Sequence, residues 1–345
     1  MWNPANCDRC GDCFVECLYV DWDREKAVQE ITTLIETGTS EILTACATCC
    51  GCNEYCEKGA NPWDLILKRQ DETGCLPILP KAPAMFEMAA ASPSSVVKGE
   101  PGKPAISLCM MESLSTKIFQ GRIFEGLTVI KGGEYFCNIG YLHIGRERPI
   151  REGAQKFVDN LAATGAEEII CFHEDCYAML AGKAPDYGVH VPFRPVHLYE
   201  YLLDYVKAHE KEITKLDLKV AHQAPCASRY SRDKDPLLDE ICDRIGVTRV
   251  DRVYDRRHSL CCGGPLISRG AKDQSMKIGQ MNLDDARGFF HYPPDGALAV
   301  GVRVEDMMAA PALADSIQNA LGRFDYHCND WVDLNRNLFQ CCLLY

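Results

Sequence analysis

Residues 7–17 read CDRCGDCFVEC and residues 46–56 read CATCCGCNEYC, so four cysteines with the spacing C-x2-C-x2-C-x3-C occur twice. Three cysteines at successive intervals of three residues can bind one face of a four-iron cubane, and iron–sulfur clusters select thiolate ligands. When two such clusters share a domain, the fourth cysteine of each run binds the cluster of the other run. The expected ligand sets are Cys7, Cys10, Cys13 with Cys56, and Cys46, Cys49, Cys52 with Cys17.

Zinc is the competing metal for these runs. A zinc site takes four ligands, commonly from two C-x2-C-like pairs. A zinc site does not require three evenly spaced cysteines followed by a fourth, repeated twice. The runs therefore predict two [4Fe–4S] clusters. Leu18 and Glu57 occupy the positions where proline usually follows the last cysteine of such a run. The absence of proline puts the local backbone geometry in doubt but does not affect the assignment of the ligands. Cys50 adjoins Cys49 and is expected to be a packed thiol that points elsewhere.

The composition of the chain fits metal binding better than disulfide formation. Its 345 residues include 21 cysteines, an odd number that cannot pair completely. The first residues lack a basic start and an apolar run, and no stretch approaches the roughly 18 apolar residues of a membrane helix. We therefore expect a cytoplasmic protein, free or peripheral to a membrane complex. The formal net charge of −12 argues against a nucleic-acid partner.

Composition and periodicity divide the chain into four segments. Residues 1–76 hold both cysteine runs and predict a helical two-cluster domain, with a small core at residues 25–42. Residues 77–104 are rich in proline and small residues and predict a linker. From residue 105 onward, strand-like and helix-like patterns alternate, which predicts an α/β fold with parallel sheets. The alternation appears twice, so we expect two similar halves, at residues 105–212 and 213–345.

Apolar periodicity locates the individual elements of these halves. Strands are expected at residues 106–108, 168–172, 219–222 and 297–300. Helices are expected at residues 154–162, 196–206, 238–245 and 305–321. Gly165 and Gly246 follow two of the helical patterns and are expected to end them.

A further cysteine pattern lies near residue 226. Cys226 is followed, after 34 residues, by Cys261-Cys262-Gly263-Gly264, and the two glycines permit the turn that lets adjacent thiols face one metal. Together with the two runs, this pattern resembles the iron–sulfur subunits of heterodisulfide reductase and their relatives in glycolate, lactate and glycerol-3-phosphate oxidation. Those proteins join a two-cluster ferredoxin domain to paired cysteine-rich CCG domains. A full CCG motif is a Cys, a later Cys-Cys pair and a C-x2-C.

The resemblance extends over nearly the whole chain. It includes AHQAPC at residues 221–226, similar to the family's His-x-Pro-Cys, and CYAML at residues 176–180. In heterodisulfide reductases, CCG motifs hold non-cubane clusters that cleave a disulfide. The candidate metal ligands that the resemblance implies are Cys109, Cys137, Cys171, His173 and Cys176 in the first half, and Cys226, Cys261 and Cys262 in the second.

Both CCG motifs are incomplete. In the first half, His173 stands in the place of a cysteine, and in the second half Gly301 and Val304 replace the C-x2-C. Three interpretations compete. The first half holds a third cubane or a zinc ion; the second half holds a cluster completed by a tail cysteine; or both halves are docking scaffolds. The tail cysteines are Cys328, Cys341 and Cys342.

The resemblance predicts an iron–sulfur electron-transfer subunit of an anaerobic, multi-subunit oxidoreductase, with Cys226, Cys261 and Cys262 as candidate catalytic residues. The sequence has no phosphate-binding loop and no dinucleotide fingerprint, so a flavin- or ferredoxin-type donor is expected on a partner subunit. A docking module and a metallocluster-assembly protein are the alternatives. The remaining cysteines and histidines that we assign to packing or surface are Cys75, Cys242, His143, His190, His197 and His291.

Overall fold

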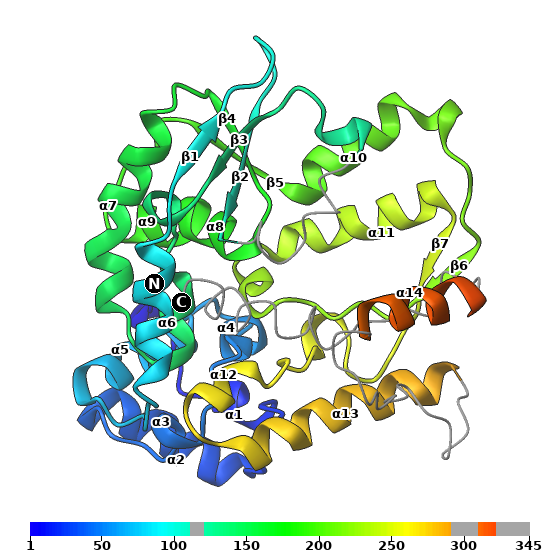
Figure 1. The fold of residues 1–345 in the computed structure, drawn as a ribbon. Coiled ribbons are helices and arrows are strands. Elements are labelled where there is room, and N and C mark those ends of the chain that lie inside the picture. Colours follow the sequence, from blue (N-terminus) through cyan, green and yellow to red (C-terminus); the bar gives the residue numbers. More distant parts are fainter. Residues whose placement is uncertain (111–120, 291–309, 322–345) are drawn as a thin grey trace. The chain divides into compact units, whose positions relative to one another are not determined.

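The computed structural model describes residues 1–110, 121–290 and 310–321 (Figure 1). The chain forms two compact units, Met1–His291 and Tyr292–Tyr345, and the described part of the second unit is helix α14 (Ala310–Leu321). The boundaries expected at residues 76, 104 and 212 all fall within the first unit.

Short helices surround the two cysteine runs. They are α1 (Asp12–Val15), α2 (Arg24–Thr37), α3 (Ile42–Ala45), α4 (Gly51–Tyr55) and α5 (Pro62–Thr73). Helix α2 is the core helix expected at residues 25–42. It begins where the Asp23 side chain accepts a hydrogen bond from the Lys26 N–H at 2.9 Å, and it ends at Gly38 in the left-handed conformation. Its buried face packs in one hydrophobic cluster with Phe14 and Trp63.

The α/β fold class is confirmed by a five-stranded sheet with the order β1-β3-β2-β4-β5. Its strands are β1 (Ser95–Val97), β2 (Ala105–Cys109), β3 (Thr128–Lys131), β4 (Glu168–Cys171) and β5 (Arg194–His197). Strands β2 to β5 pair in parallel, and β1 pairs antiparallel with β3. A second sheet pairs β6 (Leu218–Val220) and β7 (Val247–Arg249) in parallel.

Helices cover both faces of the larger sheet (Figure 1). Helix α7 (Arg148–Ala162) buries its apolar stripe against one face, where Cys109, Ile130 and Ile169 point. The opposite face carries Ile106, Leu108 and Ile170 and packs against α10 (Leu198–Ala208). Burial on both faces explains why these strands are apolar throughout.

The remaining helices follow the sheet strands or belong to the C-terminal part of the first unit. They are α8 (Glu174–Ala178), a π-helical turn (Met179–Lys183), α9 (Ala184–Asp186), α11 (Asp235–Ile245), α12 (Gly264–Ser268) and α13 (Lys272–Phe290). Helix α11 ends at Gly246 in the left-handed conformation, as its sequence predicts. No helix among residues 1–110, 121–290 and 310–321 combines the length and apolarity needed to cross a membrane.

Several expected elements differ from the structure. The segment at residues 77–104, expected as a linker, contains α6 (Lys81–Ala90) and the edge strand β1. Helix α6 is ordered because it packs: the Phe86 ring contacts the Tyr141 ring in a tilted arrangement, with ring centroids 4.7 Å apart. The helix expected from residue 196 begins two residues later, because Val196 and His197 complete β5.

Other elements were not expected at all, or fall outside the described residues. Sequence periodicity missed β3, β7 and α13, the first two because they are only three or four residues long. The strand expected at residues 297–300 lies outside the described residues, as does the start of the helix expected at residues 305–321. Among the described residues the second half contributes β6 and β7 but no larger sheet, so the repeated architecture stays a prediction.

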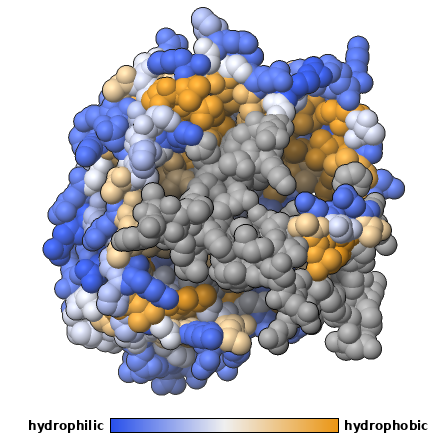
Figure 2. Space-filling view, in the orientation of Figure 1, coloured by the Kyte–Doolittle hydropathy of each residue, from blue (hydrophilic) through white to orange (hydrophobic). Residues whose placement is uncertain are grey.

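The face of the molecule in Figure 2 mixes hydrophilic residues with several apolar patches. Exposed apolar side chains include Met85 and Met88 on α6, and Val253 after β7. Single apolar side chains of this kind are normal on a folded protein and carry no functional argument by themselves.

Candidate metal centres

The first N-terminal site brings together one triplet of cysteines and a cysteine from the other run. Four cysteines line a small cavity of about 40 Å³, namely Cys7, Cys10, Cys13 and Cys56. Burial, and then the charge of Cys56, raise the pKa of the Cys13 thiol. Gly11 makes the loop possible, because its φ is +80° and a Cβ there would lie 3.0 Å from the backbone of α2.

The second N-terminal site gathers Cys17 with the triplet at residues 46–52. The pKa of the Cys52 thiol is raised by burial and then by the charges of Cys17, Cys13 and Cys46. Cys46 Sγ accepts a hydrogen bond from the Thr48 N–H at 3.3 Å, and Cys49 Sγ accepts one from the Gly51 N–H at 3.4 Å. Backbone donors aimed at sulfur stabilise a thiolate, as iron–sulfur ligation requires. The donor set therefore fits a cluster.

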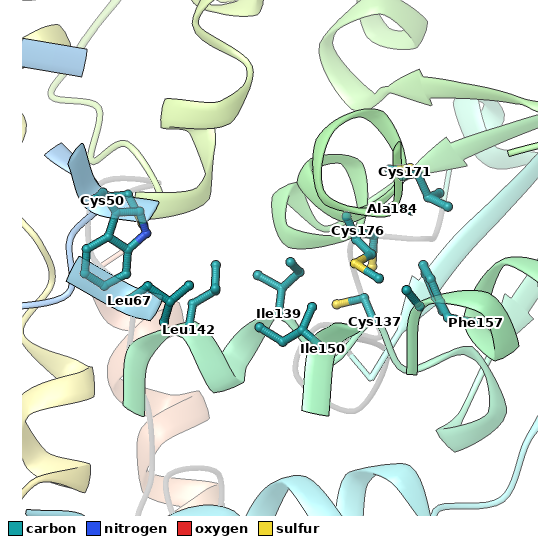
Figure 3. Close-up of a cluster of buried hydrophobic side chains, with 14 of the residues drawn as sticks. Cys50, Leu67, Cys137, Ile139, Leu142, Ile150, Phe157, Cys171, Cys176 and Ala184 are labelled. Carbon is teal, nitrogen blue, oxygen red and sulfur yellow. The ribbon is translucent and has the colours of Figure 1, made fainter. Parts of the chain in front are cut away.

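Cys50 lies outside both sets. It is buried, with a relative exposure of 1%, and adopts a positive φ of 63° that turns it away from its neighbour Cys49. Its side chain joins the hydrophobic cluster that also contains Leu67 (Figure 3). This is the packed thiol that its position in the run predicts.

A third site lies at the carboxyl edge of the larger sheet. It consists of four residues whose ligand atoms all lie within 4.8 Å of one another: Cys109, Cys137, His173 and Cys176. Cys109 ends β2, and His173 follows the adjacent parallel strand β4 and precedes α8. The carboxyl ends of parallel strands meet at one edge, so the fold itself brings these two residues together.

The charges of this third site favour a bound cation. The thiols of Cys137 and Cys176, together with the His173 ring, hold the pKa of the Cys109 thiol well below its usual range. His173 Nδ1 is buried and makes no hydrogen bond of normal geometry to the described residues. His173 Nε2 lies 3.6 Å from the Asp175 carboxylate, on the side of the ring away from Nδ1. Nδ1 is therefore the nitrogen available to a metal.

The size of the third site bears on which metal it could hold. A tetrahedral zinc ion, with bonds of about 2.0–2.3 Å, holds its ligand atoms about 3.4–3.8 Å apart. A cubane places four irons between its thiolates and spreads them farther. Ligand atoms that are already within 4.8 Å of one another, without an ion between them, therefore fit a single zinc-type ion better than a cubane.

Cys171 is not part of this set, although the resemblance named it as a ligand. It lies in β4, and its Sγ contacts the Ile169 carbonyl at 3.9 Å. Figure 3 shows the side chains of Cys137 and Cys176 pointing toward each other while Cys171 stands apart. Cys171 lies in the same buried cluster as Cys109, Cys137 and Cys176, but its Sγ is not among the ligand atoms that converge.

The fourth site contains Cys226, Cys261 and Cys262. Hydrogen bonding with Cys226 is the largest cause that raises the pKa of Cys261, and Cys261 in turn raises the pKa of Cys262. The three thiols are therefore neighbours, although among the described residues only the Cys109 set is compact enough for one ion. The tail cysteines and residues 301 and 304 lie outside the described residues.

The turn that joins these thiols depends on glycine. The Gly263 N–H donates to Cys261 Sγ and the Gly264 N–H donates to Cys262 Sγ, both at 3.4 Å. Gly263 has φ +82°, and a Cβ there would lie 2.8 Å from the Ser275 carbonyl oxygen. Only glycine fits without movement, as the Cys-Cys-Gly-Gly sequence suggests.

The fourth site contacts the second N-terminal site through Tyr19. The Cys261 N–H donates to the Tyr19 hydroxyl at 2.6 Å. Burial, and then the charges of Cys49 and Cys261, raise the pKa of Tyr19, which therefore lies near both cysteines. Ala47 packs in the same hydrophobic cluster as Leu260. The loop that carries the second cysteine triplet thus adjoins the fourth site.

Two buried arginines also join the C-terminal part of the first unit to the second N-terminal site. Arg229, three residues after Cys226, donates to Glu54 and to the Ser259 carbonyl, and its charge lowers the pKa of Cys49 against the larger effect of burial. Arg269 donates to the carbonyl oxygens of Cys46 and Thr44. Sequence patterns did not single out Tyr19, Arg229 or Arg269, because their partners lie more than a hundred residues away along the chain.

Comparison with known proteins identifies one part of the chain. Residues 220–290 match the family model of the CCG cysteine-rich domain, which occurs in heterodisulfide reductase-type subunits. The match spans Cys226, Cys261 and Cys262 and covers about a fifth of the chain. Neither the curated proteins nor the solved structures gave a significant match. The cysteine-rich domain and the compact set at Cys109 together indicate metal binding and a redox-related role.

Proposed function

We propose that this protein is an iron–sulfur electron-transfer subunit of an anaerobic, multi-subunit oxidoreductase of heterodisulfide-reductase type. In this proposal the two N-terminal cysteine sets bind [4Fe–4S] clusters, and the site at Cys226, Cys261 and Cys262 is the electron acceptor or donor at the other end. When bound, clusters of this kind accept and release single electrons.

The observation that carries the proposal is the spatial order of three cysteine sites. Cys13 of the first set lies close enough to Cys52 of the second set to influence its pKa. The second set is joined to the fourth site through Tyr19, whose hydroxyl binds the Cys261 backbone and whose neighbours include Cys49. A continuous series of adjacent redox-capable sites is what electron transfer needs, and a cluster-storage protein has no need of it.

The side chains of this chain have specific parts in the proposed function. Backbone N–H groups donate to sulfur in the second and fourth sites, which partly offsets the effect of burial and favours the thiolate form that a bound metal needs. Arg229 places a buried positive charge near Cys49, and Asp8 and Asp12 place negative charges near Cys10. A positive charge favours the reduced state of a bound cluster and a negative charge disfavours it. We therefore propose that the second set has the higher potential, which favours electron flow toward the fourth site.

The set at Cys109 has a different part in the proposal. Its three cysteines and one histidine form a closed four-ligand site, which is typical of structural zinc. A zinc ion there would fix the end of β2 against α8 and would not change its oxidation state. We propose a structural zinc site in the first half.

The partner and location follow from the same proposal. Electrons must enter from a flavin- or ferredoxin-type donor on another subunit, because the sequence offers no nucleotide-binding fingerprint. The proposed location is the cytoplasm, either free or at the surface of a membrane complex.

A docking scaffold is the second candidate, and one observation favours it. Arg269 and Arg229 bind the loop and helix of the second cysteine run, so the C-terminal part also holds the N-terminal region in place. Metal content separates the two candidates. Two clusters alone give about eight irons per chain, and a loaded fourth site adds further iron.

The proposal is tested by iron, sulfide and zinc analysis of the full chain isolated without oxygen. We expect at least about eight irons and eight sulfides per chain. Cys49→Ser should remove or convert one cluster, and Cys50→Ser, the matched control at the adjacent buried thiol, should leave both. About four irons in the unsubstituted protein, or equal losses in the two variants, would disprove the ligand assignment.

A further inference from the structure

Arg269 carries a buried positive charge between the fourth site and the second cysteine set. It directly follows α12 and is 7% exposed. Its two terminal nitrogens donate to the carbonyl oxygens of Cys46 and Thr44. Its Nε is buried and has no hydrogen-bond partner among the residues that the structure describes. Within that part of the chain, the guanidinium group therefore forms hydrogen bonds only to neutral carbonyl groups.

Other buried cations of this chain are paired with carboxylates. The pairs are Arg229–Glu54, Arg249–Asp255, Arg252–Asp285 and Lys183–Asp64. Arg269 forms no such pair with a carboxylate of residues 1–110, 121–290 and 310–321. Burial lowers the pKa of Arg269, and the charges that act against burial belong to two thiols, Cys46 and then Cys75. Because a buried charge without a partner is costly, we expect an anion beside Arg269 in the metal-loaded protein.

The second cysteine set can supply this anion. Arg269 binds the backbone of Cys46, whose thiol is one of the four ligands expected for the second cluster. A four-iron cluster with four thiolate ligands is anionic, and it gains a further negative charge on reduction. A fixed cation therefore stabilises the reduced state more than the oxidised state. Screening by solvent is weak here, because Cys46 and Cys52 are each only 6% exposed.

We propose that Arg269 is the counter-ion of the cluster bound by the second cysteine set and that its charge raises the reduction potential of that cluster. The inference rests on the proposed function, because it requires a cluster at this set. Only α12 separates Arg269 from Gly263 and Gly264 at the Cys-Cys-Gly-Gly turn or overlaps them, so one short segment carries both this charge and part of the fourth site. A docking scaffold needs only the hydrogen bonds of Arg269, whereas a counter-ion needs its charge.

Two substitutions separate the charge of Arg269 from its hydrogen bonds. Arg269→Lys keeps the charge, and Arg269→Gln keeps an N–H donor without the charge. Arg249→Met is the matched control, because the Arg249 side chain is 2% exposed but pairs with Asp235 and Asp255. Each full-length variant is isolated without oxygen, analysed for iron and titrated with redox mediators while the electron paramagnetic resonance of its reduced clusters is recorded. The signal that is lost in Cys49→Ser identifies the second cluster.

At a fixed solution potential, we expect the ratio of reduced to oxidised second cluster to fall at least about tenfold in Arg269→Gln, which corresponds to about 59 mV for one electron. Arg269→Lys should change this ratio less than about threefold. Arg249→Met should leave the ratio unchanged, even where it lowers the melting temperature.

The iron content separates failure of this inference from failure of the proposed function. An unchanged ratio in Arg269→Gln with about eight irons per chain, or an equal fall in Arg269→Lys, would overturn the role of Arg269 and leave the proposed function intact. If Arg269→Gln loses the second cluster, retention of the cluster and its ratio in Arg269→Lys supports the counter-ion, and loss in both variants supports a scaffold instead. An unsubstituted chain with fewer than about four irons would overturn both proposals.

Discussion

Replacement of Lys183 by methionine is expected to destabilise the protein strongly. Lys183 lies in the π-helical turn after α8, its side chain is 1% exposed, and its ammonium group pairs with Asp64 of α5, which is 3% exposed. Glu147 Oε1 lies 4.0 Å from the same ammonium. The Lys183–Asp64 pair thus joins α5, the helix that follows Cys56, to the segment that carries Cys176. Lys183→Met keeps the side-chain volume but leaves Asp64 buried and without its cation.

The size of the effect follows from the burial of both partners. Removing one member of a buried ion pair costs about 3–5 kcal/mol, because the other charge stays buried without compensation. With an unfolding entropy of about 2.1 cal/mol/K per residue, this corresponds in a chain of this size to a fall in melting temperature of about 4–7 °C. Asp64→Asn alone should also destabilise. The double variant Lys183→Met with Asp64→Asn should recover much of the loss, because it leaves no unpaired carboxylate at this position.

The assay is anaerobic thermal and urea unfolding of the metal-loaded full chain, followed by circular dichroism. Lys68→Met is the matched control, because Lys68 lies on α5, the helix that carries Asp64. Its ammonium lies 3.9 Å from Glu72 on an exposed face, so the expected change is below about 0.5 kcal/mol. If Lys183→Met stays within about 1 kcal/mol of the unsubstituted protein, or if the double variant loses the sum of both single losses, the buried pair does not hold these regions together.

Three further predictions concern the metal sites. Cys176→Ser should remove about one zinc per chain, whereas Cys171→Ser should retain it; metal analysis showing zinc loss in both would place Cys171 among the ligands. Zinc affinity should fall as pH falls, by up to about a hundredfold per pH unit. The reason is that interaction with Cys109 and then burial raise the pKa of the Cys137 and Cys176 thiols, so both must lose a proton to bind zinc. Chelator competition between about pH 6 and pH 8 measures the affinity, and an affinity that does not change with pH would contradict the prediction. Arg229→Met should lower the reduction potential of the second cluster by about 100 mV, which is the effect of a unit charge at about 7 Å in an effective dielectric of about 20. Redox titration measures the shift. An equal shift in the exposed control variant Arg232→Met would refute the prediction.

Local sequence patterns predicted the parts of the fold that depend on local chemistry. The spacing of the two cysteine runs fixes which thiols can face one another, and the structure places Cys56 with the first triplet and Cys17 with the second. Helices α2 and α7 follow their apolar periodicity, and Gly246 ends α11 because it tolerates a positive φ. In each case the signal lies within a few residues of the feature.

Features that depend on tertiary contacts could not be predicted in this way. The composition of the proline-rich segment at residues 77–104 predicts a linker, yet its Phe86 contacts Tyr141, and this packing orders α6. Cys171 and Cys176 are both plausible ligands by spacing and both are buried in one cluster, but only the Cys176 thiol lies close to the ligand atoms of Cys109, Cys137 and His173. The cavity beside Cys226 is assembled from segments between residues 54 and 260, so no local sequence pattern indicates it.

The two halves of the C-terminal part have different candidate ligands, and the difference suits two different kinds of metal chemistry. In the first half a histidine replaces one cysteine, and the four candidate ligand atoms lie within 4.8 Å of one another. Such a closed set leaves no position for a substrate. In the second half Cys226 lines a cavity, its thiol neighbours those of Cys261 and Cys262, and Tyr19 links Cys261 to the second cysteine set. Because catalysis needs an open position and a route for electrons, the incomplete motif of the second half is better suited to chemistry than the complete set of the first.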